Sequence, residues 1–461
     1  MLLLWVFLLP AVFAALPDRD YKIYRLIPAN REQREALEDA YLKRDADVEF
    51  FHNPLKTGGN IDVQAYSEEF ERFLLEKNID FVQMHPNDDQ KVPSNSSAPD
   101  NCEIFRLGKY CDYDSMIAYL QKLEWKHPHL VELVVLGMTH HGRPIMGARI
   151  GRRGTRAAVI DAGIHPREWQ APHSAMFFIN ELVRGYGSDL QITEILNKLT
   201  VFIIPMLNPD GYEYGRSADF ASVRMWRGNR GPRTIVNGSD CSGTDLNRNF
   251  DFNFGEKGAS NDSCAHDYHG IGAFSEPETR TIRDLIFKLT IMGKVDAYIA
   301  FHSFGKKLLL PGSDDKLDAD LLTIVGKVDA YIAFHSFGKK LLLPGSDDKL
   351  DADLETVANE AADAMAKLYE QRYEVGTVVQ MVQYNASGGS IDWVHEIARV
   401  KYAFGVEVGP YRGVGQEIEN VFPYFQPPKE ELMPIARESW EGVKVILRAA
   451  VDLHSNDCDN L

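Results

Sequence analysis

Hydrophobic and polar positions divide the chain into two parts with different patterns. In the first part, from about residue 18 to residue 89, short alternating strands surround two polar helices, which indicates a small α+β unit. Strands are expected at 21–27, 47–51, 60–63 and 80–84, and helices at 31–41 and 67–77. Residues 86–101 are rich in Pro, Asn, Asp and Ser and predict an exposed linker.

From about Phe105 onward, apolar strands alternate with helices. This alternation predicts an α/β fold in which helices cover both faces of a sheet. Strands are expected at 131–137, 157–162, 200–206 and 402–408, and helices at 115–124, 175–185, 276–289 and 354–369.

A perfect internal repeat interrupts the second part. Residues 293–321 and 326–354 are identical, and each copy contains an apolar strand that ends at a histidine, His302 or His335. Both strands cannot occupy one place in a sheet, so we expect one copy to be looped out or added elsewhere. The sequence favours neither histidine. An extra apolar strand on a surface would also carry a risk of aggregation.

Composition and the first residues narrow the class of protein. A formal net charge of −17 argues against a nucleic-acid binder, which would show a basic patch. Residues 1–15 combine a short apolar run with two alanines, which predicts a signal peptide and a secreted protein. No later apolar run is long enough for a membrane span, so we expect no membrane partner. The chain is therefore expected to divide into a signal peptide at 1–15, an N-terminal unit with its linker at 16–104 and a larger α/β unit at 105–461.

An exported chain can form disulfides. There are five cysteines, so at least one stays unpaired within a monomer. We expect Cys241 to pair with Cys264, which flanks the same loop-rich stretch, and Cys102 to pair with Cys111. Cys458 is then the cysteine for which we expect no partner within the monomer.

Candidate chemistry begins at His165 and Glu168, which follow the apolar strand at 157–162. They offer a divalent metal one nitrogen and one oxygen, and a catalytic zinc needs three protein ligands plus an open position. This pair alone is weak evidence for a metal. Further candidates lie at the ends of other expected strands, where side chains converge on one edge of an α/β sheet. They are Arg227, Asn247, Arg248, His302 or His335, Tyr384 and Glu407.

Eight motifs carry a resemblance to a family. They are GIHPREW, LNPDGYEY, MWRGNR, GTDLNRNFD, YHGIGAFSEPET, FHS, YNASGGSIDW and the segment around Glu407. In this order they resemble the zinc metallocarboxypeptidases of the carboxypeptidase A/B type, in their secreted proenzyme form, and the resemblance covers nearly the whole chain. It implies a mixed, mostly parallel central sheet, preceded by an α+β open-sandwich propeptide that an activating protease removes.

The resemblance also implies roles for individual residues. His165, Glu168 and His302 (or equally His335) would bind one zinc ion per chain, with Asp245 holding the ring of His165. Glu407 would act as the general base.

Arg227 would stabilise the oxyanion that forms on the attacked carbonyl group. Asn247, Arg248 and Tyr384 would bind the terminal carboxylate of the substrate, for which an arginine fork is well suited. Arg167 would contribute to an adjoining subsite.

Two further features of the resemblance concern specificity. Gly388 and Gly389 would make the Tyr384 loop mobile. Ile391 matches the base of the specificity pocket and implies a preference for apolar or aromatic C-terminal residues. The expected protein is a monomeric carboxypeptidase that acts on peptides and proteins and is made as a zymogen. Two alternatives remain: a peptide-binding protein that the duplication has disabled, and a metal-dependent amidase that acts on a non-peptide acyl group.

Overall fold

The computed structural model describes most of the chain. The described residues are 22–43, 48–51, 54, 60–65, 68–84, 102, 105–152, 154, 156–217, 221–232, 234–236, 239–303, 328–334, 340–342, 352–369, 372–376, 387–390, 393–398, 400–410 and 422–453. None of the helices in these ranges is long and apolar enough to cross a membrane.

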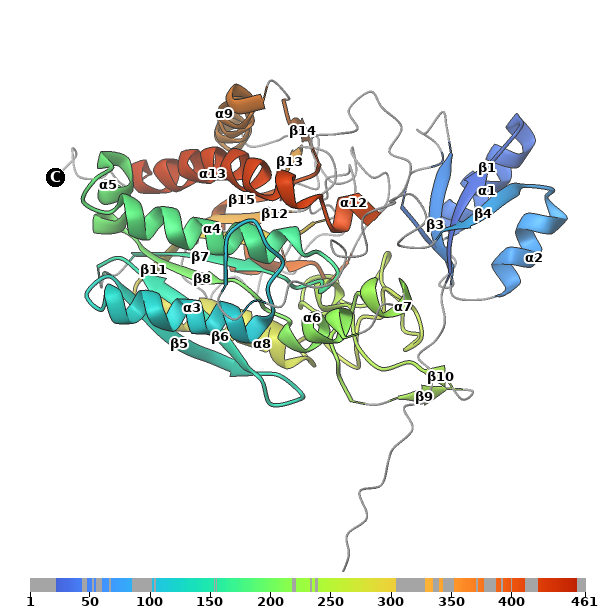
Figure 1. Ribbon diagram of the computed structural model, residues 1–461, viewed down its shortest axis with the longest axis horizontal. Helices are drawn as coiled ribbons and strands as arrows, with labels where there is room; N and C mark the ends of the chain where they lie inside the picture. Colours follow the sequence, from blue (N-terminus) through green and yellow to red (C-terminus); the bar gives the residue numbers. More distant parts are fainter. Residues whose placement is uncertain are drawn as a thin grey trace, which may run out of the picture.

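A nine-stranded sheet forms the centre of the larger unit (Figure 1). Its middle strands are mutually parallel, and antiparallel strands flank them on both sides, which confirms the expected mixed, mostly parallel sheet. In spatial order the strands are β14 (Glu374–Gly376), β13 (Lys340–Leu342), β15 (Val400–Glu407), β12 (Val328–Phe334), β11 (Lys294–Phe301), β7 (Arg156–Ala162), β8 (Thr200–Ile204), β6 (Pro144–Ile150) and β5 (Val131–Met138).

Helices cover both faces of this sheet, as the alternating pattern predicts. Figure 1 shows α4 and α13 along one side and α3 and α8 along the other. The helices among the described residues of this unit are α3 (Tyr113–Lys126), α4 (Gln170–Gly185), α5 (Leu190–Lys198), α6 (Pro209–Arg216), α7 (Ala221–Arg224), α8 (Pro277–Met292), α9 (Ala352–Tyr369), α12 (Phe422–Phe425) and α13 (Lys429–Asp452). Two short elements, η1 (Leu246–Arg248) and η3 (Trp393–Ile397), and the hairpin of β9 (Ile235–Val236) and β10 (Ser239–Asp240) complete it.

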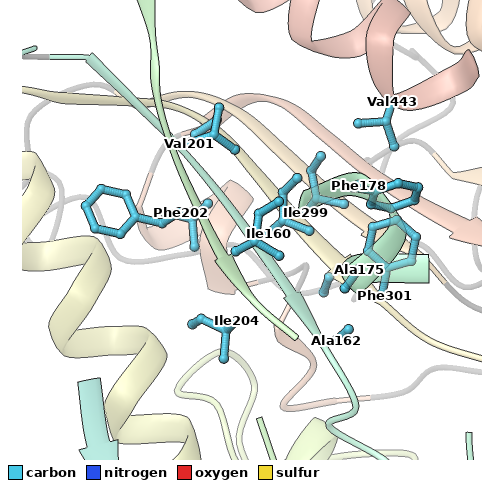
Figure 2. Close-up of a cluster of buried hydrophobic side chains, with 14 of the residues drawn as sticks. Ile160, Ala162, Ala175, Phe178, Val201, Phe202, Ile204, Ile299, Phe301 and Val443 are labelled. Atoms are coloured by element: carbon cyan, nitrogen blue, oxygen red, sulfur yellow. The ribbon is translucent and has the colours of Figure 1, made fainter. Parts of the chain in front are cut away.

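Aliphatic and aromatic side chains fill the space between the sheet and its helices (Figure 2). Phe178 of α4 lies between Phe301 of β11 and Trp440 of α13, with ring centroids 4.8 and 5.5 Å away. Burial of each such ring contributes about 1.5–3 kcal/mol to folding. This packing fixes the position of β7 and β11, whose carboxyl ends carry the candidate metal ligands.

Both copies of the repeat contribute a strand to the central sheet. β11 pairs with β7, and β12 lies between β11 and β15, with Phe301, Phe334 and Val406 in register. The strand of the second copy, β12, is therefore added between β11 and β15, so it is an interior strand of the sheet rather than an exposed edge strand. The risk of aggregation expected for an apolar surface strand does not apply to it. Because neighbouring strands lie about 4.8 Å apart, the insertion puts β15 about 10 Å from β11.

The N-terminal unit is the expected α+β structure. Its antiparallel sheet has the order β2-β3-β1-β4, and its helices share one apolar core with it. The elements are β1 (Lys22–Ile27), α1 (Arg31–Lys43), β2 (Val48–Phe50), β3 (Ile61–Ala65), α2 (Glu68–Glu76) and β4 (Asp80–Met84).

The larger unit covers part of the N-terminal sheet. All five residues of β3 are buried, although a strand covered on one face only would bury alternate residues. The ring of Phe51 lies 5.9 Å from that of Phe425 in α12. The two units are therefore packed against each other on the side of the sheet that α1 and α2 leave open.

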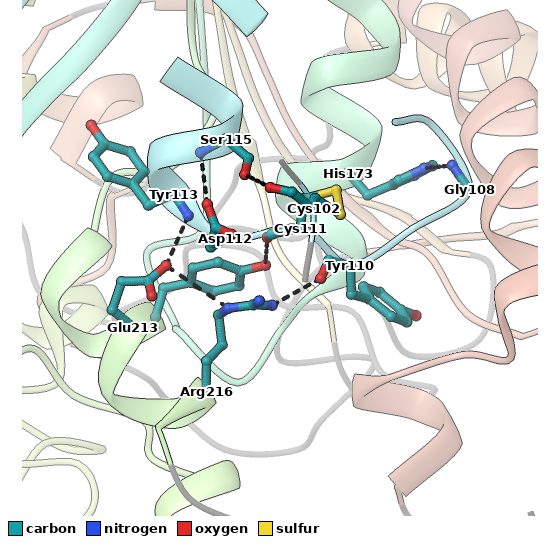
Figure 3. Close-up of a disulfide and its surroundings, with 11 residues drawn as sticks. Cys102, Gly108, Tyr110, Cys111, Asp112, Tyr113, Ser115, His173, Glu213 and Arg216 are labelled. Atoms are coloured by element: carbon teal, nitrogen blue, oxygen red, sulfur yellow. Dashed lines mark hydrogen bonds and ion pairs between the residues drawn. A yellow bond between two sulfur atoms is a disulfide. The ribbon is translucent and has the colours of Figure 1, made fainter. Parts of the chain in front are cut away.

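Both expected disulfides are present. Cys102 is bonded to Cys111, and Cys241 to Cys264. Figure 3 shows the first of them beside His173, whose Nε2 accepts a hydrogen bond of 2.8 Å from the backbone N–H of Gly108. Cys458 lies outside the described residues.

Candidate functional site

Three buried side chains meet at the carboxyl end of the parallel strands. His165 and Glu168 lie in the turn between β7 and α4, and His302 directly follows β11. Their exposed fractions are 2%, 3% and 0%. His165 Nδ1 lies 2.8 Å from Glu168 Oε1 and 3.1 Å from His302 Nδ1, and His302 Nδ1 lies 3.5 Å from Glu168 Oε2. The structure thus brings the first histidine copy to the other two candidates.

These three donors fit a zinc ion by number, kind and spacing. Ligands about 2.0–2.2 Å from a tetrahedral zinc lie roughly 3.4 Å from one another, close to the separations found here. Three protein ligands leave the fourth position open, which is the arrangement of a catalytic site.

Protonation states at the cluster also suit a metal. Burial alone would raise the pKa of the Glu168 carboxyl, but the two histidines lower it to about 2. Burial lowers the pKa of His302 to about 4. Glu168 is therefore ionised and His302 neutral at pH 7, and these are the forms that bind a metal ion.

Asp245 holds the far side of the His165 ring. Its Oδ1 lies 3.1 Å from His165 Nε2 and accepts a hydrogen bond of 3.0 Å from the backbone N–H of Asn247. Burial would raise the pKa of the Asp245 carboxyl, but Arg227 and Arg248 hold it well below its usual range. An ionised carboxylate in this position fixes both the tautomer and the orientation of a metal-binding histidine.

Arg227 lies between Asp245 and the N-terminal unit. Its Nε donates to Asp245 Oδ2 over 2.9 Å, and its Nη1 lies 3.9 Å from Glu49 Oε1. A pocket that the Cys241–Cys264 disulfide helps to line opens beside it. The guanidinium group is therefore at the rim of the metal cluster, with one edge tied to Asp245.

Asn247 and Arg248 are buried in η1, directly after Asp245. Asn247 Oδ1 accepts from the backbone N–H of Ser390, and Arg248 Nε donates to the carbonyl oxygen of Gly258 over 2.7 Å. Gly388 has a φ of 70°, and a Cβ atom there would lie 2.3 Å from the carbonyl oxygen of Arg248. Gly388 thus serves close backbone packing against η1.

Arg167 makes its strongest contact with the N-terminal unit. Its guanidinium group, of which 0% is exposed, donates from Nη2 to Glu49 Oε1 over 2.7 Å and from Nη1 to Glu49 Oε2 over 3.0 Å. Burial would raise the pKa of the Glu49 carboxyl, but Arg167 with help from His266 and Arg227 lowers it below its usual range. Glu49 could not be recognised from the sequence, because this contact joins residues of two separate units.

The remaining candidates are only partly covered by the structure. His335, Tyr384 and Ile391 lie outside the described residues. Glu407 is the last residue of β15, where its backbone is opposite Lys340 of β13, and its side chain is not among those described.

Comparison with known proteins is consistent with this site. Residues 116–442 match the sequence profile of the zinc carboxypeptidases. Carboxypeptidase B of Astacus astacus is 32% identical over 354 residues, which cover 75% of this chain and 98% of the relative. Carboxypeptidase A2 of Rattus norvegicus is 30% identical over 447 residues, 94% of each chain. The crystal structure of carboxypeptidase A from Helicoverpa armigera has a TM-score of 0.68 at 25% identity, over 94% of this chain and 97% of that one.

Proposed function

The chain belongs to the zinc carboxypeptidases, which are hydrolases, and from this premise we propose its specific reaction. It removes apolar or aromatic residues from the C-termini of peptides and proteins, depends on one zinc ion and is made as a secreted zymogen. The observation that carries the proposal is the buried cluster of His165, Glu168 and His302.

His165, Glu168 and His302 would hold the zinc ion, which would supply a Lewis acid for the scissile carbonyl group and would make water a nucleophile near neutral pH. Two histidines and one glutamate are also the ligand set of the catalytic zinc in carboxypeptidase A. Asp245 keeps His165 in the orientation that leaves Nδ1 facing the cluster.

Protein side chains carry out the remaining steps. Glu407 takes the proton of the attacking water and passes it to the nitrogen of the leaving amine. Arg227 stabilises the negative charge that develops on the carbonyl oxygen, as a donor held in place before the reaction. Its hydrogen bond to Asp245 supports this role, because that bond fixes the guanidinium group beside the metal cluster.

Recognition of the free carboxylate makes the enzyme an exopeptidase. Arg248 and Asn247, with Tyr384, bind that carboxylate, and Ile391 forms the apolar base of the pocket for the C-terminal side chain. The activated chain should therefore release Phe and Leu at least about tenfold faster than Lys or Glu from otherwise identical peptides, since an unpaired charge is costly in an apolar pocket. Preferred release of Lys would refute the role of Ile391.

The N-terminal unit acts as an inhibitory propeptide. Support comes from Glu49, whose carboxylate joins Arg167 and also approaches Arg227. This contact occupies two cationic side chains that a substrate would need. The expected activating protease cuts between the two units, after which both arginines become accessible.

A pair of variants tests this inhibitory contact in the uncleaved chain. Removal of one partner of a buried ion pair at an interface costs about 2 kcal/mol or more, so Glu49→Gln should raise the activity before cleavage at least about tenfold. Glu71→Gln is the matched control, because Glu71 bonds Lys22 and Tyr24 within the N-terminal unit. Equal activity of both variants before cleavage would exclude Glu49 as an inhibitory group.

One observation favours the alternative of a disabled peptide-binding protein. β12 separates the strand of His302 from the strand of Glu407. The metal cluster itself is complete without the second copy, which supports the enzyme as the principal proposal.

A further inference from the structure

A second cluster of buried titratable groups lies behind Arg227, and the proposed reaction does not use it. Glu276 and Glu278, at the start of α8, are 5% and 0% exposed. Both carboxylates accept from the same amide group, Asn229 Nδ2, over 2.8 and 2.9 Å. His140 Nε2 lies 2.9 Å from the Oε2 atom of Glu276.

Asn229 itself is bonded through every polar group that it has. Its backbone N–H donates to the carbonyl oxygen of Thr244, and its Oδ1 accepts from the backbone N–H of Thr244, both over 3.0 Å. Its carbonyl oxygen accepts from Trp226 Nε1 over 3.2 Å. Through these bonds, Asn229 holds the segment that precedes it at a fixed distance from the segment around Thr244.

Two glycines allow the backbones of these segments to touch. A Cβ atom at Gly228 would lie 2.9 Å from the carbonyl oxygen of Thr244, and one at Gly243 would lie 2.4 Å from that of Asn229. The two segments joined by Asn229 and Thr244, which we call the clamp, end immediately beside the metal cluster, because Arg227 precedes Gly228 and Asp245 follows Thr244. Any shift of Asn229 therefore moves Arg227 relative to Asp245.

We propose that Asn229 is a positioning residue for Arg227, and that it holds this position while the Glu276–Glu278 pair retains a proton. The proposal rests on the proposed role of Arg227 at the oxyanion. It adds a group that controls the reaction from outside the substrate cleft.

The charges around the pair explain the need for a proton. Two ionised carboxylates on one amide group repel each other. Among the described residues, His140 faces Glu276 as a base, with Arg280 acting on His140, and the Tyr268 hydroxyl also interacts with Glu276. Burial raises the pKa of Glu278 to about 7. Burial also opposes ionisation of Glu276, but His140 and Asn229 lower its pKa. Glu278 is therefore the member that gains a charge as the pH rises through about 7.

Glu278→Gln provides the decisive variant, since an amide keeps the shape and the hydrogen bond to Asn229 but cannot ionise. The ratio of wild-type kcat to variant kcat should be constant at pH 5–6 and fall at least about threefold by pH 8.5, with the KM ratio unchanged. Glu438→Gln is the matched control. Glu438 is also a fully buried glutamate, but it lies on α13 beside Tyr373.

A pH-independent ratio, or the same change of ratio in the Glu438→Gln control, would overturn the proposal. Asn229→Ala should lower kcat about 10- to 100-fold with little change in KM, because a donor to the oxyanion loses its position. Wild-type kcat in this variant would likewise overturn it. If Asn229→Ala does not fold, the Glu278→Gln ratio decides alone.

A phosphonate peptide, which carries the charge of the oxyanion, gives a readout that does not need turnover. Its affinity for the wild-type chain should fall relative to that for Glu278→Gln above pH 7, and an unchanged ratio of affinities would again overturn the proposal. Absence of any peptide hydrolysis by the protease-activated wild-type chain would instead refute the proposed function, so the two failures are distinguishable.

Discussion

The two identical copies of the repeat allow a test of the metal centre with a nearly perfect internal control. His302 and His335 follow the same sequence, so His302→Gln and His335→Gln change the same residue in the same local context. His302 Nδ1 lies 3.1 Å from His165 Nδ1 and 3.5 Å from Glu168 Oε2. We therefore expect zinc to bind much more weakly after the first substitution and with unchanged affinity after the second.

The size of the effect follows from the number of ligands. Zinc binds to four-ligand protein sites with about 10–16 kcal/mol, or about 2.5–4 kcal/mol for each ligand. Loss of His302 should weaken zinc binding by two to three orders of magnitude. Competition with a chromophoric chelator measures this affinity directly, and metal analysis gives the zinc content of the purified chains.

A weaker affinity in His335→Gln than in His302→Gln would refute the reasoning, because the second copy would then supply the third ligand. Equal losses in both variants would also contradict it. Circular dichroism of both variants controls for a loss of folding, since His302 is fully buried.

Three other predictions test separate parts of the account. Burial lowers the pKa of His173 to about 4 from an ordinary value near 6.5, so up to roughly 3 kcal/mol of folding stability should be lost as the pH falls from about 6.5 through 4. Denaturant unfolding at pH 7 and pH 4 should show a smaller loss in the His173→Gln variant than in the wild type, and equal losses would contradict the assignment. Ile391→Asp should shift preferred release from Phe towards Lys in assays with matched peptides, and an unchanged preference would place Ile391 outside the pocket. Deletion of residues 322–354 removes one copy of the repeat and should bring β15 beside β11. If β12 separates Glu407 from the metal centre, kcat should rise after this deletion, whereas an unchanged kcat would show that the insertion is harmless.

Much of the fold and the metal centre could be predicted because local patterns determine them. His165 and Glu168 follow a buried strand, and His302 follows a second strand that pairs with the first in parallel. Parallel neighbours end at one edge of a sheet, so the alternation of strands and helices predicts that His165 and Glu168 lie near the histidine of one repeat copy, but it does not predict which copy. The expected N-terminal α+β unit follows from the same kind of pattern.

Other features depend on contacts that no local pattern contains. Glu49 reaches Arg167 only because two units pack together, across 118 residues of sequence. The place of β12 could not be predicted, because identical strands have identical propensities and their neighbours in the sheet decide between them. The clamp at Asn229 lies within motifs that the sequence displays, but its function depends on the approach of two backbones at Gly228 and Gly243.

The most direct test of the central claim is the release of C-terminal Phe by the protease-activated chain, before and after chelation and again after zinc is restored. The account predicts release that chelation abolishes and that about one equivalent of zinc per chain restores. Release that persists without metal, or no release from any peptide by folded protein free of its N-terminal unit, would contradict the claim.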